Sequence, residues 1–284
     1  MGGKVSGRYK EITSTANPLI KEIRALALKK NRDLNQVFMA EGLKLVSDAV
    51  EKGWDVKTLI FGKSLDGEKE LKQRVDALAA KVLAKGGDIL EVSNKVLSTI
   101  TKRDNPQMVV GVIRQKWLSN DQVKPGRTGF WIALDRVRDP GNLGTIIRTA
   151  DAVGADGVLL IGQVTDAFAI EAVRATMGSI FHIPLAHMEL SQFLQWKQNW
   201  PGIVVGTHLM GAVDHRAIDY QNKPVMLLMG NEQQGLPDEL AEICDHLALI
   251  AMDGAADSLN LAIATGVMAF EIRRHALKLD DTND

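Results

Sequence analysis

The 284-residue sequence is poor in cysteine and in aromatic side chains, with one cysteine and 5% Phe, Trp and Tyr. Cys244 cannot form an internal disulfide, and it follows the apolar stretch LAEI, so we interpret it as a small core residue without a chemical role. No apolar run is long enough to span a bilayer, and the N-terminal MGGKVSGRYK lacks the apolar middle of a signal peptide. We therefore expect a cytoplasmic protein without a membrane partner.

Three common catalytic patterns are also missing. The six histidines show neither H-E-x-x-H nor another zinc-ligand spacing, which argues against a metal centre. The G-x-S-x-G pattern of serine hydrolases is absent. The glycines of GNLG at 141–144 do not follow G-x-G-x-x-G, and no P-loop lysine or serine comes after them. A nucleotide-dependent oxidoreductase is therefore an alternative that the spacing disfavours.

The charge is nearly balanced, with 34 basic and 35 acidic residues, but its distribution is uneven. Residues 4–32 contain eight basic residues and two acidic ones. Such a cluster is either the solvated face of a helix or a surface that binds phosphate groups, and the sequence leaves both interpretations open. Within the cluster, the candidates for contacts with RNA are Lys21, Lys29, Lys30 and Arg32.

The order of apolar patterns indicates a small α/β unit at the N-terminus. A helix is expected over 17–30, and further helices over 43–53 and 94–101. Strands are expected at 37–42, 56–62, 88–93 and 108–114. The polar segment around Lys124-Pro125-Gly126 then reads as a linker. We predict one domain over residues 1–118, a linker over 119–127 and a second domain over 128–284.

The second domain alternates short apolar runs with helical patterns, which is typical of a parallel sheet buried on both faces. Strands are expected at 130–135, 157–162, 202–207, 225–230 and 246–252. Helices are expected at 142–154, 169–179, 190–198 and 236–244, with a closing helix from Ser258 to about His275. Open sheets of this kind bind ligands beyond the carboxyl ends of their strands, so the residues after each strand are the candidates for a site.

Polar side chains follow three of these strands. The first strand leads into RVRDPGNLGT, which contains Asn142 and is followed by Arg148; the fourth leads to Glu232, and the last to Ser258 and Asn260. Each residue also has a plainer interpretation when it is taken alone. Asn142, Ser258 and Asn260 fit helix caps, and Arg148 fits a surface salt bridge.

Taken together, three segments resemble one family. LDRVRDPGNLGTIIRTADAVGA, LLMGNEQQGL and LIAMDGAADSLNLAIATGV are similar to motifs one, two and three of the SpoU (TrmH-like) RNA ribose 2′-O-methyltransferases of the SPOUT superfamily. The preceding ITSTANPLIKEIRALALKKNRDLNQVFMAEG resembles the family's substrate-binding domain, which is similar to ribosomal protein L30e. The resemblance implies an α/β protein, in which an L30e-like domain precedes a parallel-sheet domain with a deep trefoil knot.

The resemblance also implies S-adenosylmethionine as the cofactor and a homodimer whose active sites draw on both chains. By position in the motifs, the cofactor contacts are expected at Thr207, Gly230, Ile250, Met252, Ser258 and Leu259. The catalytic set is expected to be Arg148, Asn142, Glu232, Ser258 and Asn260. Two positions depart from the family pattern, Ala251 in place of a proline and Met108 in place of a glycine.

The role of Arg148 stays open between two interpretations. The family arginine is described as a general base, but a guanidinium is protonated and offers donors only. Arg148 can instead bind the phosphate beside the target ribose and stabilise the developing alkoxide. The substrate is also open between ribosomal and transfer RNA, and the L30e-like domain favours ribosomal RNA. A catalytically silent RNA-binding assembly factor is the alternative outside enzymes.

Overall fold

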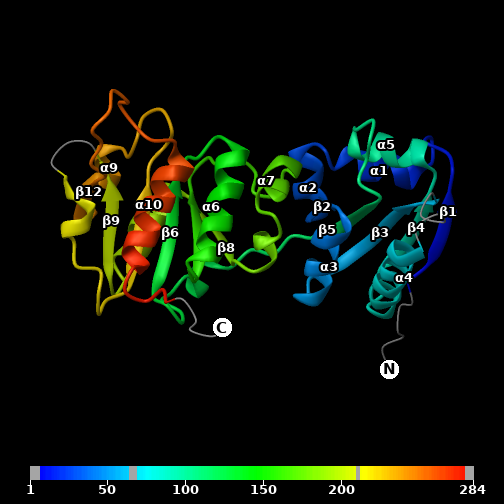
Figure 1. Cartoon of the computed structure of the whole chain (residues 1–284), viewed down its shortest axis with the longest axis horizontal. Helices are drawn as coiled ribbons and strands as arrows, with labels where there is room; N and C mark the ends of the chain where they lie inside the picture. Colours follow the sequence, from blue (N-terminus) through cyan, green and yellow to red (C-terminus); the bar gives the residue numbers. More distant parts are fainter. Residues whose placement is uncertain (1–6, 64–68, 209–211, 279–284) are drawn as a thin grey trace. The chain divides into compact units, whose positions relative to one another are not determined.

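The structure is a computed structural model that describes residues 7–63, 69–208 and 212–278. The chain forms two compact units, shown in Figure 1. The first contains residues up to Gln115 together with Phe168–Phe181, and the second contains Lys116–Ala167 and the chain from His182 onward. The sequence pattern does not predict that 168–181 joins the first unit. No described helix has the length and apolar content that a membrane span requires.

The first unit is built on a mixed sheet with the strand order β1-β4-β3-β5-β2. In this sheet β5 is antiparallel to both of its neighbours. Its strands are β1 (Tyr9–Ile12), β2 (Val37–Glu41), β3 (Val56–Gly62), β4 (Asp88–Val92) and β5 (Val109–Arg114). Its helices are α1 (Pro18–Ala25), α2 (Lys29–Asn35), α3 (Leu43–Glu51), α4 (Lys69–Ala84), α5 (Asn94–Thr101) and α7 (Ile170–Ala175). Of these, β1 and α4 are additions to the elements predicted from the sequence.

The predicted helix over 17–30 is wrong, because the chain turns after Ala25 and divides it into α1 and α2. Two side chains of α2 satisfy carbonyl groups that the break leaves without helical partners. The Asn31 Nδ2 donates to the carbonyl oxygen of Ala25, and the Arg32 Nη1 donates to that of Leu26, both at 2.7 Å. These hydrogen bonds fix Arg32 in a buried position, with 6% of its surface exposed.

The second unit contains a seven-stranded sheet in the order β10-β12-β9-β11-β6-β7-β8, and every neighbouring pair is parallel. This confirms the predicted α/β class with a parallel sheet. Its strands are β6 (Phe130–Asp135), β7 (Gly157–Ile161), β8 (Leu185–Met188), β9 (Ile203–Thr207), β10 (Val213–Asp214), β11 (Val225–Met229) and β12 (His246–Leu249). Its helices are α6 (Pro140–Ala152), α8 (Leu190–Lys197), α9 (Asp238–Ala241) and α10 (Leu261–Arg273).

Spatial order in this sheet differs from chain order where the site forms. β11 lies between β6 and β9, and β12 lies on the far side of β9. The carboxyl ends of β6, β11, β9 and β12 are therefore neighbours along one edge, although 117 residues separate Arg136 from Asp253 in the sequence. Helix α10 packs beside α6 (Figure 1), which brings the start of each helix to the same edge. Strand order alone does not test the trefoil knot, which stays a prediction.

Candidate functional site

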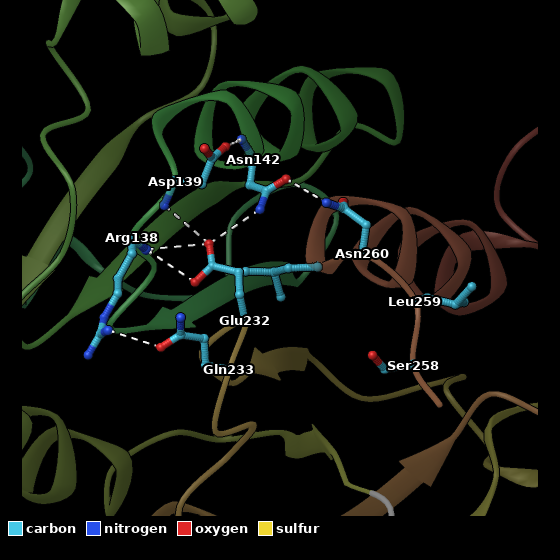
Figure 2. Close-up of a pocket in the computed structure, with 9 residues that line it drawn as sticks. Arg138, Asp139, Asn142, Glu232, Gln233, Ser258, Leu259 and Asn260 are labelled. Atoms are coloured by element: carbon cyan, nitrogen blue, oxygen red, sulfur yellow. Dashed lines mark hydrogen bonds between the residues drawn. The ribbon is translucent and has the colours of Figure 1, made fainter. Parts of the chain in front are cut away.

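An open pocket of about 550 Å³ lies where the chain leaves β6 and β11 and enters α6 and α10. Figure 2 shows its polar side chains facing one another from these segments. The lining residues are Arg138, Asp139, Asn142, Glu232, Gln233, Ser258, Leu259, Asn260 and Leu261. The pocket therefore brings together four of the five polar residues that the sequence proposes for catalysis, with Arg148 as the exception.

The start of α6 positions Asn142. Asp139 is the N-cap residue of this helix and accepts a hydrogen bond from the backbone N–H of Asn142 at 2.6 Å. Pro140 occupies the first helical turn, where its missing N–H is not needed. The interpretation of Asn142 as the cap is therefore wrong. Because Asp139 caps the helix, the amide side chain of Asn142 makes its contacts in the pocket.

The Glu232 carboxylate links the turn after β11 to the turn after β6. Its oxygens accept hydrogen bonds from the backbone N–H groups of Arg138, at 3.2 and 3.4 Å, and Asp139, at 3.2 Å. The Nδ2 of Asn142 donates to the same carboxylate at 3.3 Å, as Figure 2 shows. Three donors thus converge on one anionic side chain, and each belongs to the entrance of α6.

Asn231, the residue before Glu232, fixes the shape of this turn. It is buried, and its Nδ2 donates to the carbonyl oxygen of Arg136 at 2.8 Å. Its Oδ1 accepts hydrogen bonds from the N–H groups of Gln233 and Gln234. Gly230 permits the return of the chain, because a Cβ there would lie 2.2 Å from backbone atoms of residues 235 and 236. The position of Glu232 is therefore set by buried neighbours.

Asn260 completes the network from the start of α10. Its Oδ1 accepts hydrogen bonds from the N–H groups of Ala262 and Ile263, so it caps the helix as its plain interpretation predicts. Its Nδ2 also donates to the Oδ1 of Asn142 at 3.0 Å. The amide of Asn142 is consequently held on both sides, with its oxygen facing a donor and its nitrogen facing an acceptor. Ser258 does not cap the helix, but it lines the same pocket.

Arg148 lies apart from this network. It follows Asn142 by six residues on α6, a separation of about 9 Å along the helix axis and roughly 120° around it. Its side chain is exposed and does not line the pocket. The salt bridge that its plain interpretation predicts does not form with any residue in 7–63, 69–208 or 212–278.

The residues predicted to contact a cofactor follow the neighbouring strands. Thr207 ends β9, Gly230 follows β11, and Ile250 follows β12. Met252 and Leu259 belong to the exposed chain between β12 and α10, with 40% and 37% of their surfaces exposed. Ser258 and Leu259 are the two members of this set that line the described pocket.

Four lining residues were not identified from the sequence: Arg138, Asp139, Gln233 and Leu261. The Arg138 Nη1 donates to the Oε1 of Gln233 at 3.2 Å, a second link between the two turns (Figure 2). Two of these residues could have been found from their position in the sequence, because Arg138 and Asp139 stand immediately before the Pro-Gly that opens α6. Among the described residues, no cluster of His, Cys, Asp and Glu could hold a metal ion.

The candidate RNA-binding residues have different surroundings. Lys21 on α1 and Lys30 on α2 are exposed. Lys29 forms an exposed ion pair with Asp33, with a nitrogen–oxygen distance of 2.7 Å. Arg32 is buried and holds the Leu26 carbonyl, so it does not belong to the same open surface as the lysines.

Comparison with known proteins identifies both parts of the chain. Residues 129–270 match the model of the SpoU rRNA Methylase family, and residues 17–111 match an MRM3-like substrate binding domain. The chain is 31% identical over 246 residues to the 23S rRNA (uridine(2479)-2′-O)-methyltransferase of Streptomyces viridochromogenes, covering 84% of this chain and 83% of that one. It is 30% identical to the 23S rRNA (guanosine(2553)-2′-O)-methyltransferase RlmP of Bacillus subtilis (strain 168), covering 93% and 99%.

A solved structure gives a closer match. The AdoMet-bound rRNA methyltransferase of Sinorhizobium meliloti is 56% identical, with a TM-score of 0.89, and the match covers 95% of this chain and 99% of that one. The agreement extends over both units, and the resemblance seen in the three strand-end motifs is confirmed. The chain belongs to the SpoU rRNA methylase family.

Proposed function

We propose that this protein transfers a methyl group from S-adenosylmethionine to a ribose 2′-hydroxyl of ribosomal RNA. The observation that carries the proposal is the Asn142–Glu232–Asn260 network, which joins all three motifs of the family in one pocket. The matched substrate binding domain and two relatives named as 23S rRNA methyltransferases favour ribosomal over transfer RNA. A ribosomal substrate also agrees with the cytoplasmic location expected from the sequence.

The edge formed by β11, β9 and β12 suits the cofactor. Met252 and Leu259 expose apolar side chains in the chain that follows β12, and the polar Thr207 ends the neighbouring strand β9. Small-molecule sites combine such apolar surface with a few hydrogen-bonding groups. Thr207, Gly230, Ile250, Met252, Ser258 and Leu259 would hold the cofactor, which supplies an electrophilic methyl on a sulfonium when bound.

The polar network would hold the nucleophile. A ribose hydroxyl must approach in line with the methyl it attacks, so its position within the pocket decides the rate. Asn142 is restrained through both of its amide atoms, and Ser258 adds a hydroxyl to the same pocket. We infer that Asn142, Glu232, Ser258 and Asn260 orient the ribose, and that the carboxylate of Glu232 maintains the geometry by holding the entrance of α6.

Arg148 would act from a second copy of the chain. One face of α10 exposes Ile263, Val267 and Phe270, with 55%, 37% and 51% of their surfaces accessible. Their spacing places them on one side of the helix, as in a helix that packs against a partner. Because α10 packs beside α6, a dimer formed through this face would bring the exposed Arg148 towards the partner's pocket. There its donors would bind the neighbouring phosphate and the developing alkoxide.

Methyl transfer with labelled cofactor tests the function. The full-length protein is incubated with unmodified transcripts of 23S, 16S and transfer RNA, and the products are mapped for 2′-O-methyl groups. We expect incorporation at one ribose in 23S RNA. Incorporation into transfer RNA alone would correct the substrate, and binding of 23S RNA without incorporation would favour the silent assembly factor.

Sedimentation tests the dimer separately. Phe270→Asp places a charge in the exposed apolar face of α10 and should give a monomer. A wild-type chain that sediments as a monomer at micromolar concentration would contradict the dimer and the placement of Arg148, without affecting the assignment of the substrate.

A further inference from the structure

A second pocket lies within the first unit, and none of its lining residues is used above for catalysis or cofactor binding. It has a volume of about 240 Å³ and is formed between α1, α2, β2, the end of α5 and the segment that carries α7. Its lining residues are Leu26, Ala27, Arg32, Met39, Ile100, Thr101, Lys102, Arg103, Phe168, Ile170, Glu171 and Arg174. Because drug-sized ligands occupy pockets of about 300–1,000 Å³, this volume suits one smaller group.

The charges around this pocket favour an anion. Four cationic side chains line it, against one carboxylate from the exposed Glu171. Arg32 is buried and held by the Leu26 carbonyl, whereas Lys102 and Arg103 are exposed at the rim. Lys29 and Lys30, from the basic cluster of the sequence, belong to the same helix as Arg32. A phosphate group would therefore meet the positive charge of the held Arg32 inside the pocket, and the positive charges of the exposed Lys102 and Arg103 side chains at its rim.

Arg174 is held in place by a buried partner. Its Nε and Nη2 both donate to one oxygen of Glu41, whose side chain is 2% exposed. The Nη1 makes no hydrogen bond with any residue of the described ranges. The guanidinium plane is thus anchored through one side while it lines the pocket, an arrangement that leaves donors for a ligand.

The rest of the wall is apolar. Leu26, Met39, Ile100 and Phe168 are buried, and Ile170 is half-buried. A free inorganic phosphate would gain nothing from these side chains. An unpaired nucleotide carries both an anionic phosphate and a flat apolar base, and proteins read such nucleotides by placing the base against apolar or guanidinium surfaces.

Lys102 has a backbone conformation that glycine would adopt more easily. It is the C-cap residue of α5, with φ 55° and ψ 40° in the left-handed region. The chain therefore has a lysine at the pocket rim where helix geometry favours a residue without a side chain. Gln36 at the end of α2 has the same conformation, with φ 54°, but does not line the pocket. The two positions form a matched pair.

We propose that this pocket binds one unstacked nucleotide of the RNA substrate, with the base against the apolar wall and the phosphate on the cationic rim. The inference rests on the proposed function for the identity of the RNA. It adds a site by which the first unit would recognise a bulged or looped nucleotide distinct from the one that is methylated.

Two variants of the full-length protein test the proposal. Ala27→Phe fills the pocket without changing its charge, because Ala27 is half-buried in the lining. Its control is Ala80→Phe, an exposed alanine on α4 outside the pocket. Lys102→Gly removes one rim charge and relieves the left-handed strain, and its control is Gln36→Gly. Binding is measured by anisotropy with labelled 23S RNA fragments that contain unpaired nucleotides.

We expect Ala27→Phe to weaken RNA binding about tenfold, the loss of one stacked base. Lys102→Gly should also weaken it and lower the salt slope by about 0.7, the share of one single-strand phosphate. Both glycine variants should melt at or above the wild-type temperature, and all four proteins should bind S-adenosylmethionine normally. RNA affinity unchanged in both pocket variants would overturn the proposal. AMP that binds as tightly as the RNA fragment and displaces it would assign the pocket to a free nucleotide, and would also overturn the proposal.

The outcomes separate this inference from the proposed function. If wild-type protein methylates 23S RNA and the pocket variants bind and methylate it equally well, the inference fails alone. If wild-type protein binds this RNA through the pocket but transfers no methyl group, the proposed function fails and the nucleotide site stands.

Discussion

Replacing Glu232 with glutamine tests whether the network between the motifs sets the rate. The carboxylate accepts four hydrogen bonds of 3.2–3.4 Å from three donors, the N–H groups of Arg138 and Asp139 and the side chain of Asn142. Glutamine retains one oxygen and replaces the other with an NH₂ group, which faces donors and cannot accept. All three donors contact Oε1, so a glutamine oxygen at that position can still accept from each of them. The Arg138 N–H then loses its shorter bond to Oε2, and all three donors lose the negative charge.

The size of the effect follows from these distances. Strong charge-assisted N–H to carboxylate bonds are about 2.7–2.9 Å long. The bonds to this exposed carboxylate are longer, so we expect each to contribute a free energy at the lower end of the usual range. A hydrogen bond to a charged group contributes roughly 1.5–3 kcal/mol. We therefore expect Glu232→Gln to remove about 1–2 kcal/mol of the interaction free energy that holds the start of α6 in place. At 1.4 kcal/mol for each factor of ten, kcat/KM for RNA should fall about 5- to 30-fold.

The assay is single-turnover methyl transfer to the 23S RNA fragment that the wild-type protein modifies. The matched control is Glu239→Gln on α9, an exposed glutamate of the same unit that does not line the pocket. S-adenosylmethionine affinity should be unchanged in both variants, and Glu239→Gln should react at the wild-type rate. Normal turnover by Glu232→Gln, or an equal loss in the control, would refute the argument that this carboxylate positions the ribose.

Three further predictions follow from single side chains. Arg148→Ala should lower methyl transfer by roughly 10²–10³ with unchanged cofactor affinity, and Arg148→Lys should recover activity at high pH only if a base is required; near-normal turnover by the alanine variant would exclude both roles. Gly230→Ala should lower stability in thermal denaturation by about 1–3 kcal/mol, since its Cβ would meet backbone atoms at 2.2 Å, whereas Gly254→Ala meets nothing within 4 Å and should melt as wild type. Burial raises the pKa of the Cys244 thiol to about 12, so the protonated form dominates until the pH approaches that value, and a thiol reagent at pH 8 should label the folded protein far more slowly than the unfolded one, where the pKa is about 8.5; equal rates would place Cys244 at the surface.

Much of the second unit could be predicted from local pattern. The strand expected at 130–135 is β6 with the same bounds, because an apolar run buried on both faces is already visible in the residues themselves. The helix expected at 190–198 is α8 with a difference of one residue. The residue types of the site were visible too, since Asn142, Glu232 and Asn260 each follow a strand. Local periodicity and strand ends are properties of consecutive residues, and sequence alone contains them.

In the first unit, the break between α1 and α2 could not be predicted from local pattern. The apolar spacing of 17–30 fits one helix, yet the chain breaks at Leu26. Asn31 and Arg32 stabilise the break by binding carbonyl groups six residues earlier, and these contacts have no helical periodicity. Arg32 does not belong to the open basic surface for the same reason, because the turn at Leu26 places its side chain in a buried position.

What only the tertiary structure decided is which strand ends meet. The Asn142 amide contacts Glu232 and Asn260, 90 and 118 residues away, because β11 enters the sheet between β6 and β9 and α10 returns to pack beside α6. The same arrangement leaves Arg148 outside the pocket, although it belongs to the same motif as Asn142. The sequence by itself determined the chemistry of each side chain and the element that carries it. The order in which parallel strands pair depends on packing between distant segments, and that order placed the side chains together.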